Sequence, residues 1–115
     1  MSERIRIAET KPYDVPSSLE ALQGPGLGGV LHLGHEIIWA PHSQVINLDT
    51  IGDAIFAYTS IINEATSHDQ ERLLNKDLLL EIWPELSLPW RVYQLWEERF
   101  PRLPRNEMSY DYFQR

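Results

Sequence analysis

Three histidines, His32, His35 and His42, come closest to a metal-binding pattern in this sequence of 115 residues. His32 and His35 are three residues apart, a spacing that on a strand directs the two side chains to opposite faces. A turn at Gly34 would bring them together with Glu36, but there is no helical HExxH pattern and no cysteine. We therefore expect no bound metal and interpret these histidines as solvent-facing residues of strands and turns.

Residues 24–29 (GPGLGG) form the one glycine-rich loop of the sequence. A phosphate-binding loop directs backbone N–H groups at an anion and normally has a helix N-terminus or a lysine beside it. Here residues 30–33 (VLHL) are typical of a strand, and the neighbouring charges are acidic. We therefore interpret the loop as a turn and expect no cofactor.

The sequence also lacks the patterns of nucleophilic and acid–base catalysis. It has no cysteine and no nucleophile elbow, and Ser43, Ser60 and Ser67 lie in turn, helix and cap contexts that account for them. Among 17 aspartates and glutamates, no spacing selects a pair for proton transfer. We therefore expect that the protein is not an enzyme.

The net charge of −7 is unevenly distributed. From Pro12 to Glu71 there is no lysine or arginine, so this stretch cannot offer a phosphate-binding surface. Eight acidic residues occupy it: Asp14, Glu20, Glu36, Asp49, Asp53, Glu64, Asp69 and Glu71. Contact with a polyanion is expected from residues outside it: Arg4, Arg6, Lys11, Arg91, Arg99, Arg102 and Arg105.

Residues 90–102 combine tryptophan, tyrosine and arginine, the residue types that dominate interface energetics. The inward helical stripe runs through Val92, Leu95 and Trp96, and it does not include Trp90, Arg91 or Tyr93. We predict a partner-binding surface that comprises Trp90, Arg91, Tyr93, Arg99 and Arg102. The alternative interpretation places the set in the core, with the stem of Arg99 covering it.

A small antiparallel sheet is predicted in the N-terminal half. Alternating or continuous apolar residues bounded by turn residues indicate strands at 4–8, 30–33, 36–39 and 44–48. In the first of these, Ile5 and Ile7 alternate with arginines and are expected to face inward. Trp39, with Ile37 on its face, is expected to fill the space between the sheet and the helices.

Helices are predicted to follow and to cover this sheet. A cap at Ser17 or Ser18, with Glu20 as its capping-box partner, opens a short helix. A cap at Asp49 or Thr50 opens an amphipathic helix that ends near residue 65.

The C-terminal half is predicted to contain two further helical segments. Residues 67–70 repeat the capping-box pattern and open a helix that a bend near Asn75 divides; it ends at Ile82 or Trp83, because Pro84 follows. Ser87 is the expected N-cap of the last helix, which stops before residue 101. The sequence therefore predicts an α+β fold in which a small antiparallel sheet packs against three or four helices.

One domain, residues 1–115, is expected for a chain of this length, with residues 1–3 and 104–115 as flexible or docking tails. The N-terminus has no apolar segment of a signal peptide, and no apolar run approaches the ~20 residues that span a bilayer. Together with the absence of cysteine, this predicts a cytoplasmic protein that does not bind a membrane.

Several short motifs resemble one protein family. They are residues 9–16 (ETKPYDVP), the Gly24-Pro25 turn with the strand after it, Trp39, Asp49, residues 82–89 (IWPELSLP) and residues 96–101 (WEERFP). Across residues 4–103 the chain resembles small actinobacterial proteins labelled transcriptional regulators, encoded beside an abortive-infection-type nucleotidyltransferase. The resemblance implies an antitoxin-like partner of a nucleotidyltransferase toxin, and an acidic surface suits contact with a basic, RNA-handling enzyme.

Two functional hypotheses follow. The first is a non-enzymatic protein-binding module, an antitoxin or accessory partner of a nucleotidyltransferase. The second is a DNA-binding regulator that uses the arginine-rich C-terminal end on an operator, although Glu97 and Glu98 would lie on its recognition helix. Both functions can coexist in one protein, and a homo-oligomer is compatible with either.

Overall fold

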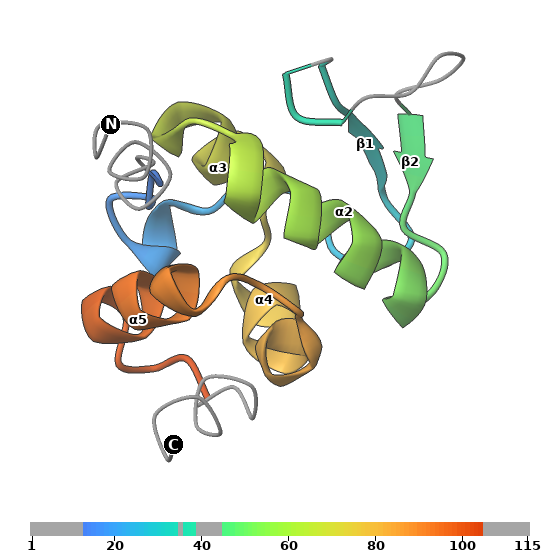
Figure 1. Ribbon diagram of the computed structural model, residues 1–115. Coiled ribbons are helices and arrows are strands. Elements are labelled where there is room, and N and C mark those ends of the chain that lie inside the picture. Colours follow the sequence, from blue (N-terminus) through green and yellow to red (C-terminus); the bar gives the residue numbers. More distant parts are fainter. Residues whose placement is uncertain (1–12, 35, 39–44, 105–115) are drawn as a thin grey trace.

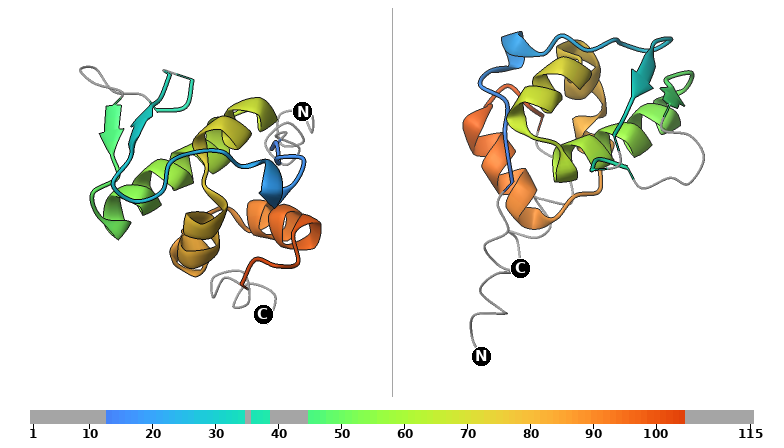
Figure 2. Two further views of the ribbon diagram at one scale, coloured as in Figure 1. Left: turned by 180° about the vertical axis from the view of Figure 1, so that it is seen from behind. Right: turned by 90° about the horizontal axis from the view of Figure 1, so that it is seen from above.

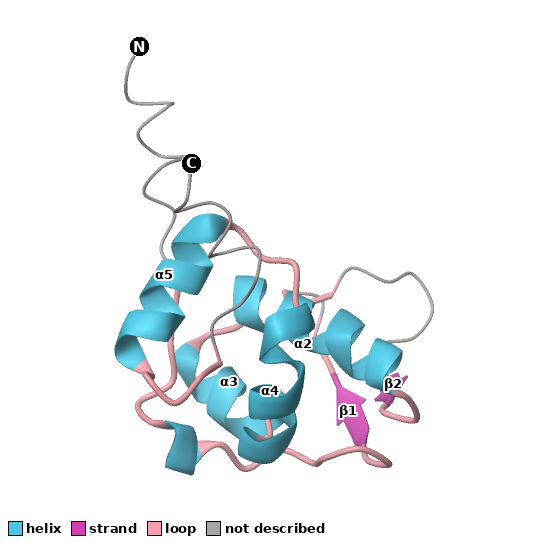
Figure 3. Ribbon diagram, turned by 90° about the horizontal axis from the view of Figure 1, so that it is seen from below, coloured by secondary structure: helices cyan, strands magenta, loops and turns pink. Residues whose placement is uncertain are grey.

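The computed structural model describes residues 13–34, 36–38 and 45–104 and confirms the predicted α+β fold (Figure 1). Within these residues, a two-stranded antiparallel sheet lies in the N-terminal half and four α-helices follow it. The sheet and α2 form one end of the molecule, and α5 lies at the other end (Figures 1 and 3). Residues 13–29 run across the helices from the α5 end to the sheet (Figure 2).

The sheet consists of β1 (Val30–His32) and β2 (Val45–Asn47). Leu31 pairs with Ile46 on the inner face, which packs towards α2, while Val30 and Val45 are exposed on the outer face. The alternation agrees with a sheet that has one solvated face.

The strand predicted at 36–39 is wrong for the residues that the structure describes. The Gly34 carbonyl accepts hydrogen bonds from the backbone N–H groups of Ile37 (3.0 Å) and Ile38 (3.1 Å), so this segment forms a turn instead of pairing with a strand. Ile37 is nevertheless buried, as expected. The strand predicted at 4–8 and the core position predicted for Trp39 lie outside the described residues.

Helix α2 (Ile51–Glu64) confirms the predicted amphipathic helix, and its N-cap is Thr50. The Thr50 hydroxyl accepts a hydrogen bond from the Asp53 N–H, and the Asp53 carboxylate accepts one from the Thr50 N–H. This reciprocal pair satisfies two backbone donors that a helix start leaves without partners. The buried face consists of Ala54, Ala57, Tyr58, Ile61 and Ile62.

Helices α3 (Ser67–Leu73) and α4 (Lys76–Ile82) confirm the predicted bend. Asn75 begins α4 as its N-cap, since its side-chain oxygen accepts from the Leu78 N–H at 3.0 Å. The N-cap of α3 is Thr66, one residue before the predicted capping box. The start of each helix leaves backbone N–H groups without partners, and the polar side chain of the N-cap residue accepts a hydrogen bond from one of them.

The short 3-10 helix η1 (Leu19–Ala21) is capped by Ser18, one of the two predicted caps. The glycine-rich loop after it is a structural turn. Its N–H groups at Gly24, Gly28 and Gly29 donate to backbone carbonyls and do not point at an open anion site. Gly28 has a φ of 89°, which favours glycine.

The 3-10 helix η2 (Trp83–Glu85) and helix α5 (Trp90–Arg99) form the aromatic part of the core. The Trp83 and Trp96 rings stack with centroids 5.8 Å apart, and Phe100 meets Trp96 edge-on at 5.7 Å. Helix α4 ends at Ile82, as predicted. The predicted cap at Ser87 is wrong: α5 begins at Trp90, and its N-cap is Pro89, which makes no side-chain capping hydrogen bond.

Candidate functional site

The predicted partner-binding residues do not form one surface. Trp90, at the start of α5, is 39% exposed, and Arg91 beside it is half-buried. Nη1 of Arg91 is buried and has no hydrogen-bond partner among the described residues. Trp90 lies nine positions before Arg99, which is ~14 Å along a helix. The two halves of the predicted surface are therefore separate.

Tyr93 corrects the predicted set, because its side chain is in the core and only 2% exposed. Its hydroxyl donates to the Leu86 carbonyl (2.8 Å) and accepts from the Leu88 N–H (2.6 Å). Burial raises the pKa of Tyr93 above its ordinary value. Tyr93 therefore holds the loop before α5 and does not face a partner.

Arg99 and Arg102 do lie together, at the C-terminal end of α5. They line a shallow groove of about 230 Å³ whose other wall is residues 17–20. Arg102 donates a hydrogen bond to the Glu20 carboxylate, and this bond holds the pKa of Glu20 below its usual value. Glu20 thus pairs with Arg102 and is not the capping-box partner that the sequence predicted.

His32 and His68, the histidines of the described ranges, belong to no cluster of acidic or histidine side chains there. No group of three or more histidine, cysteine, aspartate or glutamate side chains gathers there in a way that could hold a metal ion. His32 is exposed on the outer face of β1, as expected. His35 and His42 lie outside the described residues.

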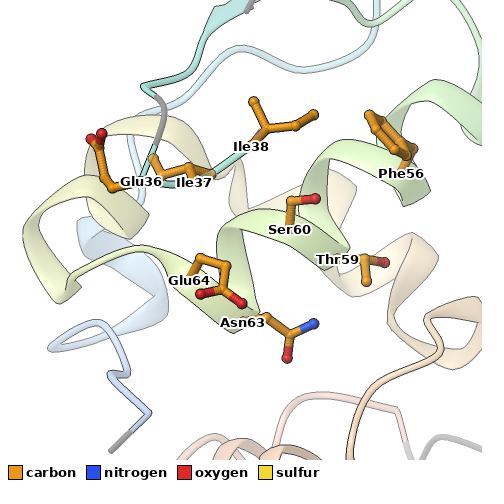
Figure 4. Close-up of a pocket in the computed structure, with 8 residues that line it drawn as sticks. All are labelled: Glu36, Ile37, Ile38, Phe56, Thr59, Ser60, Asn63 and Glu64. Carbon is orange, nitrogen blue, oxygen red and sulfur yellow. The ribbon is translucent and has the colours of Figure 1, made fainter. Parts of the chain in front are cut away.

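A larger groove, which the sequence did not predict, lies along α2 (Figure 4). We call it the α2 groove, and its volume is about 480 Å³. One wall is the turn formed by residues 36–38, and the other is the outer face of α2. The lining residues are Glu36, Ile37, Ile38, Phe56, Thr59, Ser60, Asn63 and Glu64.

The two ends of the α2 groove differ chemically. Glu36 and Glu64 lie towards one end, whereas Ile38 and Phe56 lie towards the other (Figure 4). Phe56 is 55% exposed, the highest exposure among the large apolar side chains that the structure describes. A groove with an exposed aromatic ring at one end and carboxylates at the other can contact a segment that has both apolar and basic side chains.

The side chains between these ends offer hydrogen bonds but no catalytic arrangement. The Thr59 hydroxyl donates to the Ile55 carbonyl within the helix at 2.7 Å. Oδ1 of Asn63 is buried and has no hydrogen-bond donor among the described residues. A buried oxygen without a donor favours a ligand whose N–H group can donate a hydrogen bond to it.

One sequence signal could have located this groove. Phe56 is the single large aromatic residue on the otherwise polar outer face of the predicted helix at 49–65. The opposite wall could not be found in the same way, since it depends on the turn at Gly34 in place of the predicted strand.

Comparison with protein-family models, with curated proteins and with solved structures gave no significant match. No helix among the described residues is long and apolar enough to cross a membrane. The proposed function therefore rests on the residues and their geometry, together with the resemblance described above.

Proposed function

We propose that the protein is a non-enzymatic protein-binding module and that the α2 groove is its principal contact surface. The observation that carries this proposal is that one groove has an exposed aromatic ring, Phe56, at one end and two carboxylates at the other. The groove belongs to a stretch of 60 residues, from Pro12 to Glu71, without lysine or arginine. A partner segment with apolar and basic side chains fits this chemistry.

The partner that we propose is a nucleotidyltransferase toxin, which makes this protein an antitoxin or accessory subunit in the cytoplasm. The resemblance to a family encoded beside such enzymes supports this choice. An enzyme that handles RNA needs a positively charged surface, because the phosphate backbone dominates its affinity. The acidic groove is complementary to such a surface.

The first experiment is co-purification of the tagged protein from its native gene neighbourhood, followed by size-exclusion chromatography and mass analysis. We expect a stoichiometric nucleotidyltransferase in the eluate and an affinity that falls as salt is added. A lone homo-oligomer, with no second protein, would contradict the proposal.

Two matched variants locate the contact. Phe56→Glu places a charge in the α2 groove, and Leu95→Glu does the same on the exposed side of α5; the two positions are 55% and 37% exposed. We expect Phe56→Glu to abolish co-purification and Leu95→Glu to retain it. The reverse result would assign the contact to α5, as the sequence first predicted.

DNA binding by the arginine-rich end stays the alternative hypothesis. Because Arg102 already pairs with Glu20, this end offers less free positive charge than the sequence alone indicates. DNA binding predicts an affinity for duplex DNA that falls steeply with salt, since each phosphate contact releases counterions. Titration of the purified protein with a duplex from its own promoter region, at two salt concentrations, tests it.

A further inference from the structure

We propose that the groove at the C-terminal end of α5 is a second contact surface, which binds a short acidic peptide segment whose carboxylate replaces Glu20 on Arg102. The inference goes beyond the proposed function, because it concerns a different groove and a partner segment of the opposite charge. It rests on the charges that line this groove, on the exposure of the ion pair that joins its two walls and on the state of Arg99.

The groove is basic although the chain as a whole is acidic. Its lining residues carry two positive charges, on Arg99 and Arg102, against the single negative charge of Glu20. The hydrogen bond from Arg102 lowers the pKa of Glu20, and Lys76, at the start of α4, adds to this effect through its charge. In a chain of net charge −7, three cations near one acid form a local site for an anion.

Arg99 is available to such an anion. Its side chain lies at an exposed position of α5, and it forms no hydrogen bond or ion pair with another residue that the structure describes. A guanidinium group carries its N–H donors in a planar fork that matches the two oxygens of a carboxylate. A carboxylate can therefore bind Arg99 without breaking a contact within the described part of the chain.

Glu20 shows how a carboxylate lies in this groove. Arg102 donates to it from the opposite wall, and the Arg102 and Glu20 side chains are 54% and 62% exposed. An ion pair this exposed contributes little to stability, because water screens the two charges. A carboxylate from a partner can therefore take the place of Glu20 at a small cost, and the Glu20 side chain then turns into solvent.

The groove fits an acidic peptide better than a nucleic acid. Its volume of about 230 Å³ is small, and Leu19, Phe100 and Pro101 give it an apolar lining beside the charges. A phosphate backbone instead requires a row of cations, and the neighbouring Glu98 is exposed and acidic. A segment that carries a carboxylate next to an apolar side chain matches both the charges and the apolar lining.

NMR titration of the isotope-labelled full-length protein tests the proposal with two synthetic peptides, LELEL and its neutral counterpart LQLQL, both blocked at their ends. We expect the acidic peptide to shift the amide signals of residues 17–20 and the side-chain Nε–H signals of Arg99 and Arg102, while the signals around Phe56 stay unchanged. The neutral peptide should shift none of them. Equal shifts with both peptides, or unchanged arginine signals at millimolar acidic peptide, would overturn the proposal.

Three variants test whether the peptide replaces Glu20. Glu20→Gln frees Arg102 and should tighten binding of the acidic peptide about two- to fivefold, whereas Arg99→Gln should weaken it. Glu98→Gln is the matched control, because it removes the same charge from an exposed position that does not line the groove. An equal gain in Glu20→Gln and Glu98→Gln would mean that net charge alone sets the affinity and would overturn the replacement of Glu20.

Two further measurements separate this proposal from the other functions. Phe56→Glu, which tests the α2 groove, is expected to leave binding of the acidic peptide unchanged, so either proposal can fail without the other. A short DNA duplex is titrated under the same conditions. If the duplex shifted the Arg99 and Arg102 signals and the acidic peptide did not, the groove would belong to a nucleic acid and the proposal would be wrong.

Discussion

The two ends of the molecule use their aromatic residues in opposite ways. At the α5 end, Trp83, Tyr93, Trp96 and Phe100 are all buried and contact one another in pairs. At the other end, two strands of three residues cover one side of α2 and leave Phe56 exposed in a groove. The α5 end therefore concentrates the packing energy, and the α2 end concentrates the accessible apolar surface.

The sequence predicts a contact surface among the tryptophans and arginines near the C-terminus, whereas we propose the principal one at the α2 groove. Aromatic residues serve both cores and interfaces, so their presence alone does not distinguish the two. What distinguishes them here is burial, together with partners such as Glu97, whose carboxylate accepts from Nε1 of Trp83 at 2.9 Å. Substitutions at the two ends should therefore have different consequences.

The largest effect is expected for Trp96→Ala at the α5 end. Trp96 is fully buried between Trp83 and Phe100, so truncation removes its contacts and leaves a cavity. We expect a loss of about 3–5 kcal/mol in the free energy of unfolding, measured by urea denaturation. A variant with a denaturation midpoint near the wild-type value would place Trp96 at the surface and remove the contrast between the two ends.

The second effect concerns the pH dependence of stability at the α2 end. Tyr58 of α2 is fully buried, and burial raises its pKa to about 12, against an ordinary value near 10. The unfolded chain therefore loses this proton first, and stability is full below pH 10 and falls as the pH rises towards about 12. The fall from this residue should approach about 2–3 kcal/mol.

Tyr58→Phe isolates this contribution. The variant lacks the titrating group, so its stability should decline less between pH 10 and about 12 than that of the wild type. A smaller decline remains, because the pKa of Tyr93 is also raised. An identical decline in both proteins would mean that Tyr58 is not buried as described. Stability at each pH is measured by urea denaturation.

The third effect is expected at Gly24, where the chain crosses the helices on its way to the sheet. A Cβ atom at this position would lie 2.0 Å from the Leu73 carbonyl oxygen, whereas at Gly26 the nearest atoms, in Asn75, are 4.0 Å away. We expect Gly24→Ala to cost about 1–3 kcal/mol, since backbone must shift to admit it. Gly26→Ala is the matched control and should unfold near the wild-type temperature; similar losses in both would point to a general effect of removing glycine.

Most helix boundaries could be predicted from the sequence because they depend on local rules. The caps at Thr50 and Asn75 each act over four residues or fewer. Helix α4 ends at Ile82 as predicted, although Trp83 before Pro84 keeps an α-helical backbone and leads into η2. Which side of α5 packs against the core could not be predicted in the same way. The spacing predicts Leu95 on the inward stripe and Tyr93 outside it. The structure reverses the two, because the Tyr93 hydroxyl is hydrogen-bonded to Leu86 and Leu88 in the core.

The candidate site was harder to predict than the fold. The α2 groove needs the turn at Gly34, which brings residues 36–38 opposite α2, and the pattern of residues 36–39 favours a strand. The pairing of Arg102 with Glu20 joins positions far apart in the chain and likewise has no local signal. Such contacts depend on the tertiary arrangement and not on spacing.

The fourth effect, at Thr50, tests how far α2 depends on its cap. Thr50→Ala removes the side chain that accepts from the Asp53 N–H at 3.1 Å, and we expect a loss of about 1 kcal/mol. Asp49→Ala is the control, because the exposed Asp49 does not cap the helix. Thermal unfolding of the two variants compares them, and a larger loss in Asp49→Ala would move the cap to Asp49.

The smallest of these effects is expected for Leu95→Ala, next to Trp96, where we expect the largest. Leu95 is 37% exposed on α5, and alanine favours a helix, so the free energy of unfolding should stay within about 0.5 kcal/mol of the wild type. Leu95 and Trp96 then differ several-fold in cost although they are neighbours, because one faces solvent and the other faces Trp83. A loss above about 2 kcal/mol, typical of a buried leucine, would restore the inward position that the sequence predicted for Leu95. Urea denaturation of both variants under one set of conditions decides which side of α5 faces the core.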